Sequence, residues 1–139
     1  MTPVVRSQTL PIRTESDVVQ ARKFVRQWAE DMAFNLVDQT KLVTAASELA
    51  RNTVIYGGGG DMHVEAIQNG LRTGLRLTFQ DGGPGIPDVA LALQDGYTTG
   101  KGLGLGLGGA KRLSNEFEIT SQAGHGTKVT IARWRAPAR

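Results

Sequence analysis

The sequence contains no cysteine, has only 6% aromatic residues and shows no long hydrophobic run. The missing cysteines exclude a disulfide framework, thiolate metal sites and cysteine nucleophiles. No apolar segment is long enough to span a membrane or to form the core of a secretion signal. From these absences we expect a soluble, cytoplasmic protein.

The excess of positive over negative charge is also small. Sixteen Lys and Arg face thirteen Asp and Glu, which gives a formal net charge of +3 at pH 7. Arg133, Arg135 and Arg139 near the C-terminus supply most of that excess. Without an aromatic strand motif or a helix-turn-helix pattern, such an excess is typical of a solvated surface. We therefore expect neither nucleic-acid nor membrane binding.

The first half of the chain predicts an edge strand followed by two helices. Residues 7–13 fit an edge strand, because their proline cannot donate to a central ladder. Thr14 and Asp17 predict a capping box at the start of the first helix, and Asp38 is expected to cap the second. The glycines at 57–60 should end the second helix.

Alternating apolar and polar residues predict two β-hairpins in the rest of the chain. Their strands and the short helix between them are expected at residues 62–68, 75–80, 110–115, 116–122 and 127–134. We expect one domain, residues 1–139, with an α+β fold. It would be a two-layer α/β sandwich with about three helices on one face of a mostly antiparallel mixed sheet.

Glycine is the residue in excess, and it gathers in "GKGLGLGLGG", residues 100–109. Each glycine costs roughly 0.5 to 1 kcal/mol relative to alanine in an ordered element, so the run needs a reason. Leu103, Leu105 and Leu107 alternate with the glycines, which indicates an anchored segment and not a polar linker. A glycine loop that enters a helix N-terminus is a natural seat for phosphate groups.

Two common phosphate motifs do not account for this run. A P-loop needs a glycine five positions before its Gly-Lys pair and a hydroxyl residue after it, but Asp95 and Gly102 hold those places. Residues 104–109 satisfy GxGxxG, yet no buried strand precedes them and no βαβ unit surrounds them. Another kind of phosphate site is needed.

Three further segments frame the glycine run. "ELARN" places Glu48 and Asn52 four residues apart, on one face of the second helix. "DGGPGIPD" begins at Asp81, directly after an expected strand, and "GHGT" puts Thr127 at the start of the last strand. Each segment alone fits a polar helix edge or a simple turn, whereas their order along the chain is specific.

In this order, the four segments closely resemble the N, G1, G2 and G3 boxes of the GHKL superfamily, the ATP-binding domain of gyrases, Hsp90 chaperones, histidine kinases and MutL proteins. The resemblance covers nearly the whole chain and implies the Bergerat fold. A domain of this length with glutamate in its N box resembles the anti-sigma-factor serine kinases. "ELARNTVIYGGGG" and the glycine run are most similar to the RsbT-type switch kinases of the bacterial stressosome.

The resemblance implies a role for each box. Glu48 would be the catalytic base for the attacking hydroxyl, and Asn52 would bind Mg²⁺ together with the ATP phosphates. Asp81 would accept the adenine N6 amino hydrogen and so reject a base with a carbonyl there, with Thr127 supporting the same edge. The other implied nucleotide contacts are Gly83, Gly85, Ile86, Lys101, Gly102, Leu103, Gly104, Leu105 and Gly106.

Within that set, Gly83 and Gly85 would let the backbone lie against the base. Residues 100–109 would form a phosphate-side lid, in which Gly102, Gly104 and Gly106 supply close backbone N–H contacts and Lys101 adds a positive charge. Leu105 and Leu107 would anchor the helix that follows the lid.

Three functions remain open from the sequence. The first is an ATP-dependent serine/threonine kinase that phosphorylates a STAS-domain antagonist and its scaffold and, once released, activates a PP2C-type phosphatase. The second is an anti-sigma factor kinase that sequesters a sigma subunit. The third is a nucleotide-gated binding module without significant phosphoryl transfer.

Overall fold

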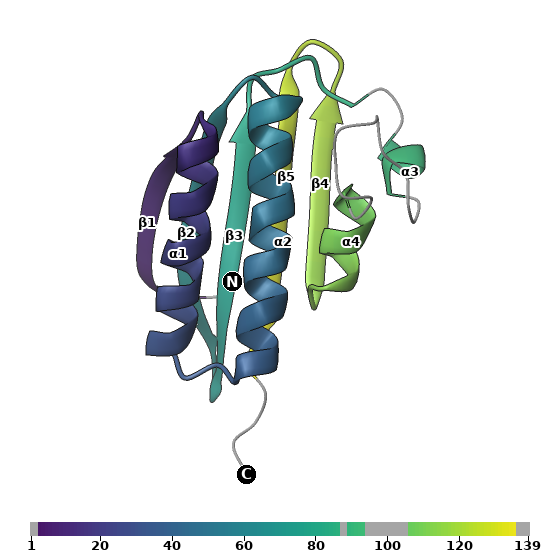
Figure 1. Ribbon diagram of the computed structural model, residues 1–139. Coiled ribbons are helices and arrows are strands. Elements are labelled where there is room, and N and C mark those ends of the chain that lie inside the picture. The colour runs from purple at the N-terminus through teal and green to yellow at the C-terminus, as the bar shows by residue number, and fades with distance from the viewer. Residues whose placement is uncertain (1–2, 87–88, 94–105, 136–139) are drawn as a thin grey trace.

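Helices cover one face of a five-stranded sheet in the computed structural model (Figure 1), which describes residues 3–86, 89–93 and 106–135 of the chain. The strands are β1 (Val4–Ile12), β2 (Gly60–Asn69), β3 (Arg72–Asp81), β4 (Glu116–Gln122) and β5 (Gly126–Trp134). The helices are α1 (Glu15–Asp31), α2 (Leu36–Ile55), the single turn α3 (Val89–Ala92) and α4 (Gly106–Arg112). These two layers confirm the predicted α+β class.

The sheet has the strand order β1-β2-β3-β5-β4, and its four described pairings are all antiparallel. The prediction allowed a mixed sheet, and no parallel pair occurs within these strands. Strand β1 lies at an edge, as its proline predicted, and β2 with β3 and β4 with β5 form the two predicted hairpins. No helix in the described part of the chain is long and apolar enough to cross a membrane.

The two long helices begin at side-chain caps. Thr14 and Asp17 form the predicted capping box at the start of α1. The prediction that Asp38 caps α2 is wrong, because Asn35 is the N-cap and its Oδ1 accepts a 2.8 Å hydrogen bond from the Asp38 backbone N–H. Asp38 lies in the first turn instead, and its carboxylate binds Arg133.

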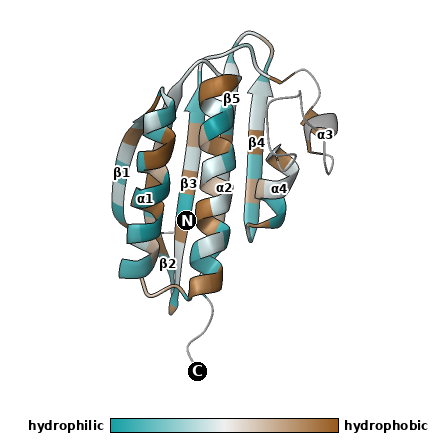
Figure 2. Ribbon diagram, in the orientation of Figure 1, coloured by the Kyte–Doolittle hydropathy of each residue, from teal (hydrophilic) through white to brown (hydrophobic). Residues whose placement is uncertain are grey.

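The core lies between the helices and the sheet. Leu42, Ala46, Leu49 and Thr53 form the predicted buried stripe of α2. Hydrophobic and polar bands alternate along β3 and β4 in Figure 2, as expected of strands with one buried and one open face. Helix α4 begins at Gly106, four residues before the predicted helix start, and buries residues 107–110.

Three chain segments meet at the upper edge of the sheet in Figure 1: the end of α2, the end of β3 and the β4–β5 turn. Gly58 and Gly59 have φ values of +73° and +105°, a conformation that glycine adopts without a steric penalty. The predicted end of α2 at these glycines is therefore confirmed, and the chain turns directly into β2 beside the end of β3.

Candidate active site

Asp81, the last residue of β3, is the centre of the predicted site. Its Oδ1 accepts hydrogen bonds from the backbone N–H groups of Gly83 at 2.9 Å and Thr127 at 3.3 Å. Both donors are main-chain groups, so the carboxylate has a fixed orientation. No described residue donates to Oδ2, which leaves that oxygen available as an acceptor.

Thr127 lies opposite Asp81 in the β3–β5 ladder. Its Oγ1 is 3.0 Å from Oγ of Ser121, and this serine accepts a 2.7 Å hydrogen bond from the backbone N–H of Ile86. Ser121 therefore links two predicted nucleotide contacts, and the sequence analysis missed it. The available signal was a serine at a position of β4 where alternation places an inward-facing residue, after Phe117 and Ile119.

Gly83 and Gly85 pack against other parts of the chain. A Cβ atom on Gly83 would lie 2.8 Å from the Cα of Gly57, and one on Gly85 would overlap the carbonyl oxygen of Gln122. Gly85 also has a φ of +81°. Contacts within the protein therefore account for both glycines, and their predicted place against a base stays a prediction.

Glu48 and Asn52 lie one turn apart on the same face of α2, as predicted. Glu48 is only 4% exposed, and Nη1 of Arg51 lies 3.3 Å from its Oε1. A buried carboxylate needs such a partner, and the sequence analysis did not predict Arg51 in this role. The Asn52 side chain makes no hydrogen bond with any described residue.

The predicted lid falls largely outside the described residues, since Lys101, Gly102, Leu103, Gly104 and Leu105 all belong to the gap at 94–105. Gly106 begins α4 with a φ of +51°. The next residue, Leu107, is buried, in agreement with the anchoring role expected of Leu107.

Two of the other predicted contacts join Asp81 in one hydrogen-bonded group. That group comprises Asp81, Gly83 and Thr127, and Ser121 adds Ile86 to it. Glu48 and Asn52 lie on α2, and Gly57, two residues beyond the end of that helix, packs against Asp81. Within the described residues, no three His, Asp or Glu side chains gather in a way that could hold a metal ion.

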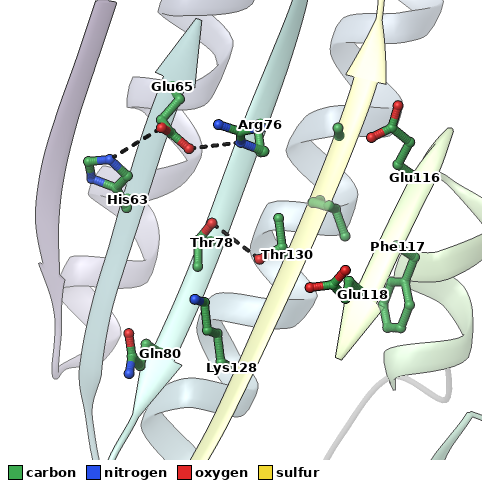
Figure 3. Close-up of a pocket in the computed structure, with 12 residues that line it drawn as sticks. His63, Glu65, Arg76, Thr78, Gln80, Glu116, Phe117, Glu118, Lys128 and Thr130 are labelled. Carbon is green, nitrogen blue, oxygen red and sulfur yellow. Dashed lines mark hydrogen bonds and ion pairs between the residues drawn. The ribbon is translucent and has the colours of Figure 1, made fainter. Parts of the chain in front are cut away.

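A concave region lies on the face of the sheet that the helices leave open (Figure 3). Its volume is about 580 Å³. Nε of Arg76 donates a 2.8 Å hydrogen bond to Oε1 of Glu65 there, and this bond lowers the pKa of Glu65 below its usual 4.5. None of the predicted site residues lines this pocket, so it is distinct from the group around Asp81.

Residues 37–138 match the family described as histidine kinase-, DNA gyrase B-, and HSP90-like ATPase. Over 123 residues, the chain is 44% identical to the serine/threonine-protein kinase RsbT of Bacillus subtilis (strain 168), with 88% of this chain and 92% of that protein covered. It is 27% identical over 124 residues to the anti-sigma F factor of Geobacillus kaustophilus (strain HTA426), with 86% of this chain and 85% of that protein covered.

Two solved structures share the fold. The RsbU and RsbW domains of Rv1364c from Mycobacterium tuberculosis superpose with a TM-score of 0.63 at 24% identity, and the match covers 95% of this chain and 34% of that one. The mycobacterial sensor histidine kinase MprB superposes with a TM-score of 0.55 at 18% identity, covering 96% of this chain and all of that one. The chain therefore belongs to the histidine kinase-, DNA gyrase B-, and HSP90-like ATPase family and, within it, to the RsbT-type serine/threonine-protein kinases.

Proposed function

We propose that this kinase transfers the γ-phosphate of ATP to a serine or threonine of a STAS-domain antagonist or scaffold protein in a bacterial partner-switching stress response. The observation that carries the proposal is the Asp81 carboxylate, which two backbone N–H groups hold at the edge of the sheet reached by the helix with Glu48 and Asn52. The 44% identity to RsbT supports the assignment to a switch kinase.

Asp81 is suited to recognise adenine. Its Oδ1 is occupied by two backbone donors, so Oδ2 is the oxygen that would accept the N6 amino hydrogen. Guanine presents a carbonyl at the corresponding position, and two acceptors facing each other would leave both unpaired. We therefore assign ATP as the nucleotide, with Thr127 and Ser121 supporting the same edge through their hydroxyl groups.

The residues present also fit magnesium. Mg²⁺ prefers oxygen ligands and takes few of them from the protein when phosphates supply the others. Asn52 offers an amide oxygen that no described residue occupies, one helical turn beyond Glu48. The bound ion would neutralise charge on the phosphates during transfer.

Glu48 is the proposed base. The acceptor hydroxyl oxygen forms a bond to the γ-phosphorus, the bond from that phosphorus to the β–γ bridging oxygen breaks, and ADP leaves with the electron pair. The hydroxyl proton passes to the Glu48 carboxylate. Arg51 holds Oε1 of Glu48 at 3.3 Å, which orients the carboxylate and leaves Oε2 for the proton.

We further propose that phosphorylation of the STAS partner releases the kinase, which then binds and activates a PP2C-type phosphatase. The similarity to the anti-sigma F factor favours one alternative, in which the released state sequesters a sigma subunit instead. A nucleotide-gated module without phosphoryl transfer is the remaining alternative.

Calorimetry and transfer assays would test the proposal together. Wild type should bind Mg-ATP in preference to Mg-GTP, and Asp81→Asn should lose at least about tenfold in ATP affinity, equivalent to about 1.4 kcal/mol. Radiolabelled ATP should then phosphorylate a STAS protein recovered from the source cell with the wild-type kinase. Equal affinity for both nucleotides would reject the adenine site, and recovery of a sigma subunit without a STAS protein would favour the anti-sigma factor.

A further inference from the structure

Gly57, two residues after the end of α2, packs against the Asp81 side chain. A Cβ atom built on Gly57 would overlap Cγ of Asp81 and would lie 2.5 Å from its Oδ2 and 2.6 Å from its Cβ. Non-bonded heavy atoms pack best at about 3.5 to 4.0 Å, so any side chain at position 57 would have to displace Asp81. Gly57 therefore packs directly against the Asp81 side chain, and no described residue donates a hydrogen bond to the Oδ2 of that side chain.

We propose that Gly57 is a specificity-determining residue, which seats the Asp81 carboxylate and thereby sets the preference for adenine over guanine. This inference rests on the proposed role of Asp81 in adenine recognition. The backbone N–H groups of Gly83 and Thr127 hold Oδ1, and the Cα of Gly57, which carries no side chain, packs beside Oδ2. These contacts restrict the position of the Asp81 side chain.

The backbone of Gly57 is itself held in place. Its N–H donates a 3.2 Å hydrogen bond to the carbonyl oxygen of Asn52, the predicted magnesium ligand. On its other side, Gly83 packs so closely that a Cβ there would lie 2.8 Å from the Gly57 carbonyl oxygen. Gly57 cannot move away from an added methyl group without disturbing one of these neighbours. The displacement would therefore fall on the Asp81 side chain.

Gly57→Ala is the test variant, and Gly82→Ala is its matched control. Gly82 directly follows Asp81, and a Cβ there would meet no atom within 4 Å. Mg-ATP and Mg-GTP are titrated separately into wild type, both variants and Asp81→Asn, and thermal melts are recorded for each. In Gly57→Ala, the ratio of ATP affinity to GTP affinity should fall at least about tenfold below that of wild type. Gly82→Ala should keep the wild-type preference.

A structural role alone would lower the melting temperature without changing the ratio of the two affinities. A folded Gly57→Ala protein with the wild-type ratio therefore overturns the inference, even when Asp81→Asn confirms the adenine site. Wild type that binds both nucleotides equally overturns the proposed adenine site and, with it, this inference.

If Gly57→Ala is too unstable to titrate, a second variant decides the case. Adding Asp81→Gly removes the three atoms nearest to the new Cβ, which are Cγ, Oδ2 and Cβ of Asp81. Recovery of folding in the double variant supports the proposed contact with Asp81. Failure of the double variant to fold counts against it, because the conflict then lies elsewhere.

Discussion

Arg133 and Asp38, 95 residues apart in the sequence, form a nearly buried ion pair that joins β5 to the first turn of α2. Nη2 and Nε of Arg133 lie 2.8 Å and 3.0 Å from Oδ1 of Asp38. Nη1 donates a further 2.9 Å hydrogen bond to the carbonyl oxygen of Leu113, which directly follows α4. One guanidinium group therefore connects the sheet with two of the helices that cover it.

Arg133→Met should lower the free energy of unfolding by about 3 kcal/mol, because it leaves the Asp38 carboxylate buried without its partner. The two side chains are only 14% and 8% exposed, so water cannot replace the lost hydrogen bonds. Chemical denaturation would measure the loss, with Lys111→Met as a control for removing an exposed cation. A loss below about 0.5 kcal/mol, as is usual for surface substitutions, would contradict this assignment.

The Glu65–Arg76 pair on the open sheet face predicts a pH dependence of stability. The hydrogen bond from Arg76 is the main cause of the lowered pKa of Glu65. Ionised Glu65 therefore stabilises the fold above pH 4.5, and this contribution disappears as the pH falls through the lowered pKa. Glu65→Gln should be less stable than wild type by about 1 kcal/mol at neutral pH, and the difference should shrink as the pH falls below 4.5 through the lowered pKa of Glu65.

Glu118→Gln is the matched control for that measurement. Glu118 lines the same pocket but is exposed, and its side chain forms no hydrogen bond or ion pair with a described residue. Denaturant titrations of both variants over the pH range would separate the pair from general charge effects. A Glu65→Gln difference that is constant with pH would contradict the role given to the ionised pair.

Most of the fold could be predicted from local sequence patterns, because the repeat of a strand or helix decides which side chains face the core. Alternation located the strands and the 3.6-residue period located the buried stripe of α2. The start of α2 was missed because Leu36 and Val37, exposed by 69% and 63%, do not follow the apolar period that marks a helix start. Asn35 could have been found as an ordinary capping residue, but Asp38 stood closer to the first periodic leucine.

The candidate site was predictable only where a motif carried it. The GHKL sequence boxes identified Asp81 and Thr127, and in the structure a hydrogen bond joins these two residues across the β3–β5 ladder. Gly57 and Ser121 were not identified, because their importance comes from contacts with residues 24 and 35 positions away in the sequence. No local period or composition records a contact of that range.

Gly106→Ala should weaken both the fold and ATP binding. Gly106 has a φ of +51° at the start of α4, and an alanine in that conformation costs about 1 to 2 kcal/mol. If the lid presents its backbone to the phosphates, the new Cβ should also lower ATP affinity by at least about tenfold. Gly70→Ala is the control, since Gly70 has a φ of +63° in the distant β2–β3 turn with nothing within 4 Å of an added Cβ. Equal ATP affinities in the two variants would show that Gly106 serves the helix start alone.

Glu48→Gln should separate nucleotide binding from phosphoryl transfer. Glutamine keeps an oxygen that can accept the 3.3 Å hydrogen bond from Arg51, so the side chain should remain in place and Mg-ATP should still bind. Glutamine cannot take the proton of the acceptor hydroxyl, and loss of a well-placed base lowers the rate by a factor of about 10² to 10⁴. Radiolabelled transfer to the STAS partner and calorimetry with Mg-ATP would measure the two effects.

Asn52→Ala provides the comparison, because it removes the amide oxygen proposed for magnesium and should weaken binding as well as transfer. Glu30→Gln, an exposed glutamate of α1, controls for the loss of one negative charge and should leave both unchanged. Transfer by Glu48→Gln at the wild-type rate would mean that another group accepts the proton. If wild type binds ATP normally but transfers no phosphate, the nucleotide-gated module is favoured, because an intact adenine site would then exist without phosphoryl transfer.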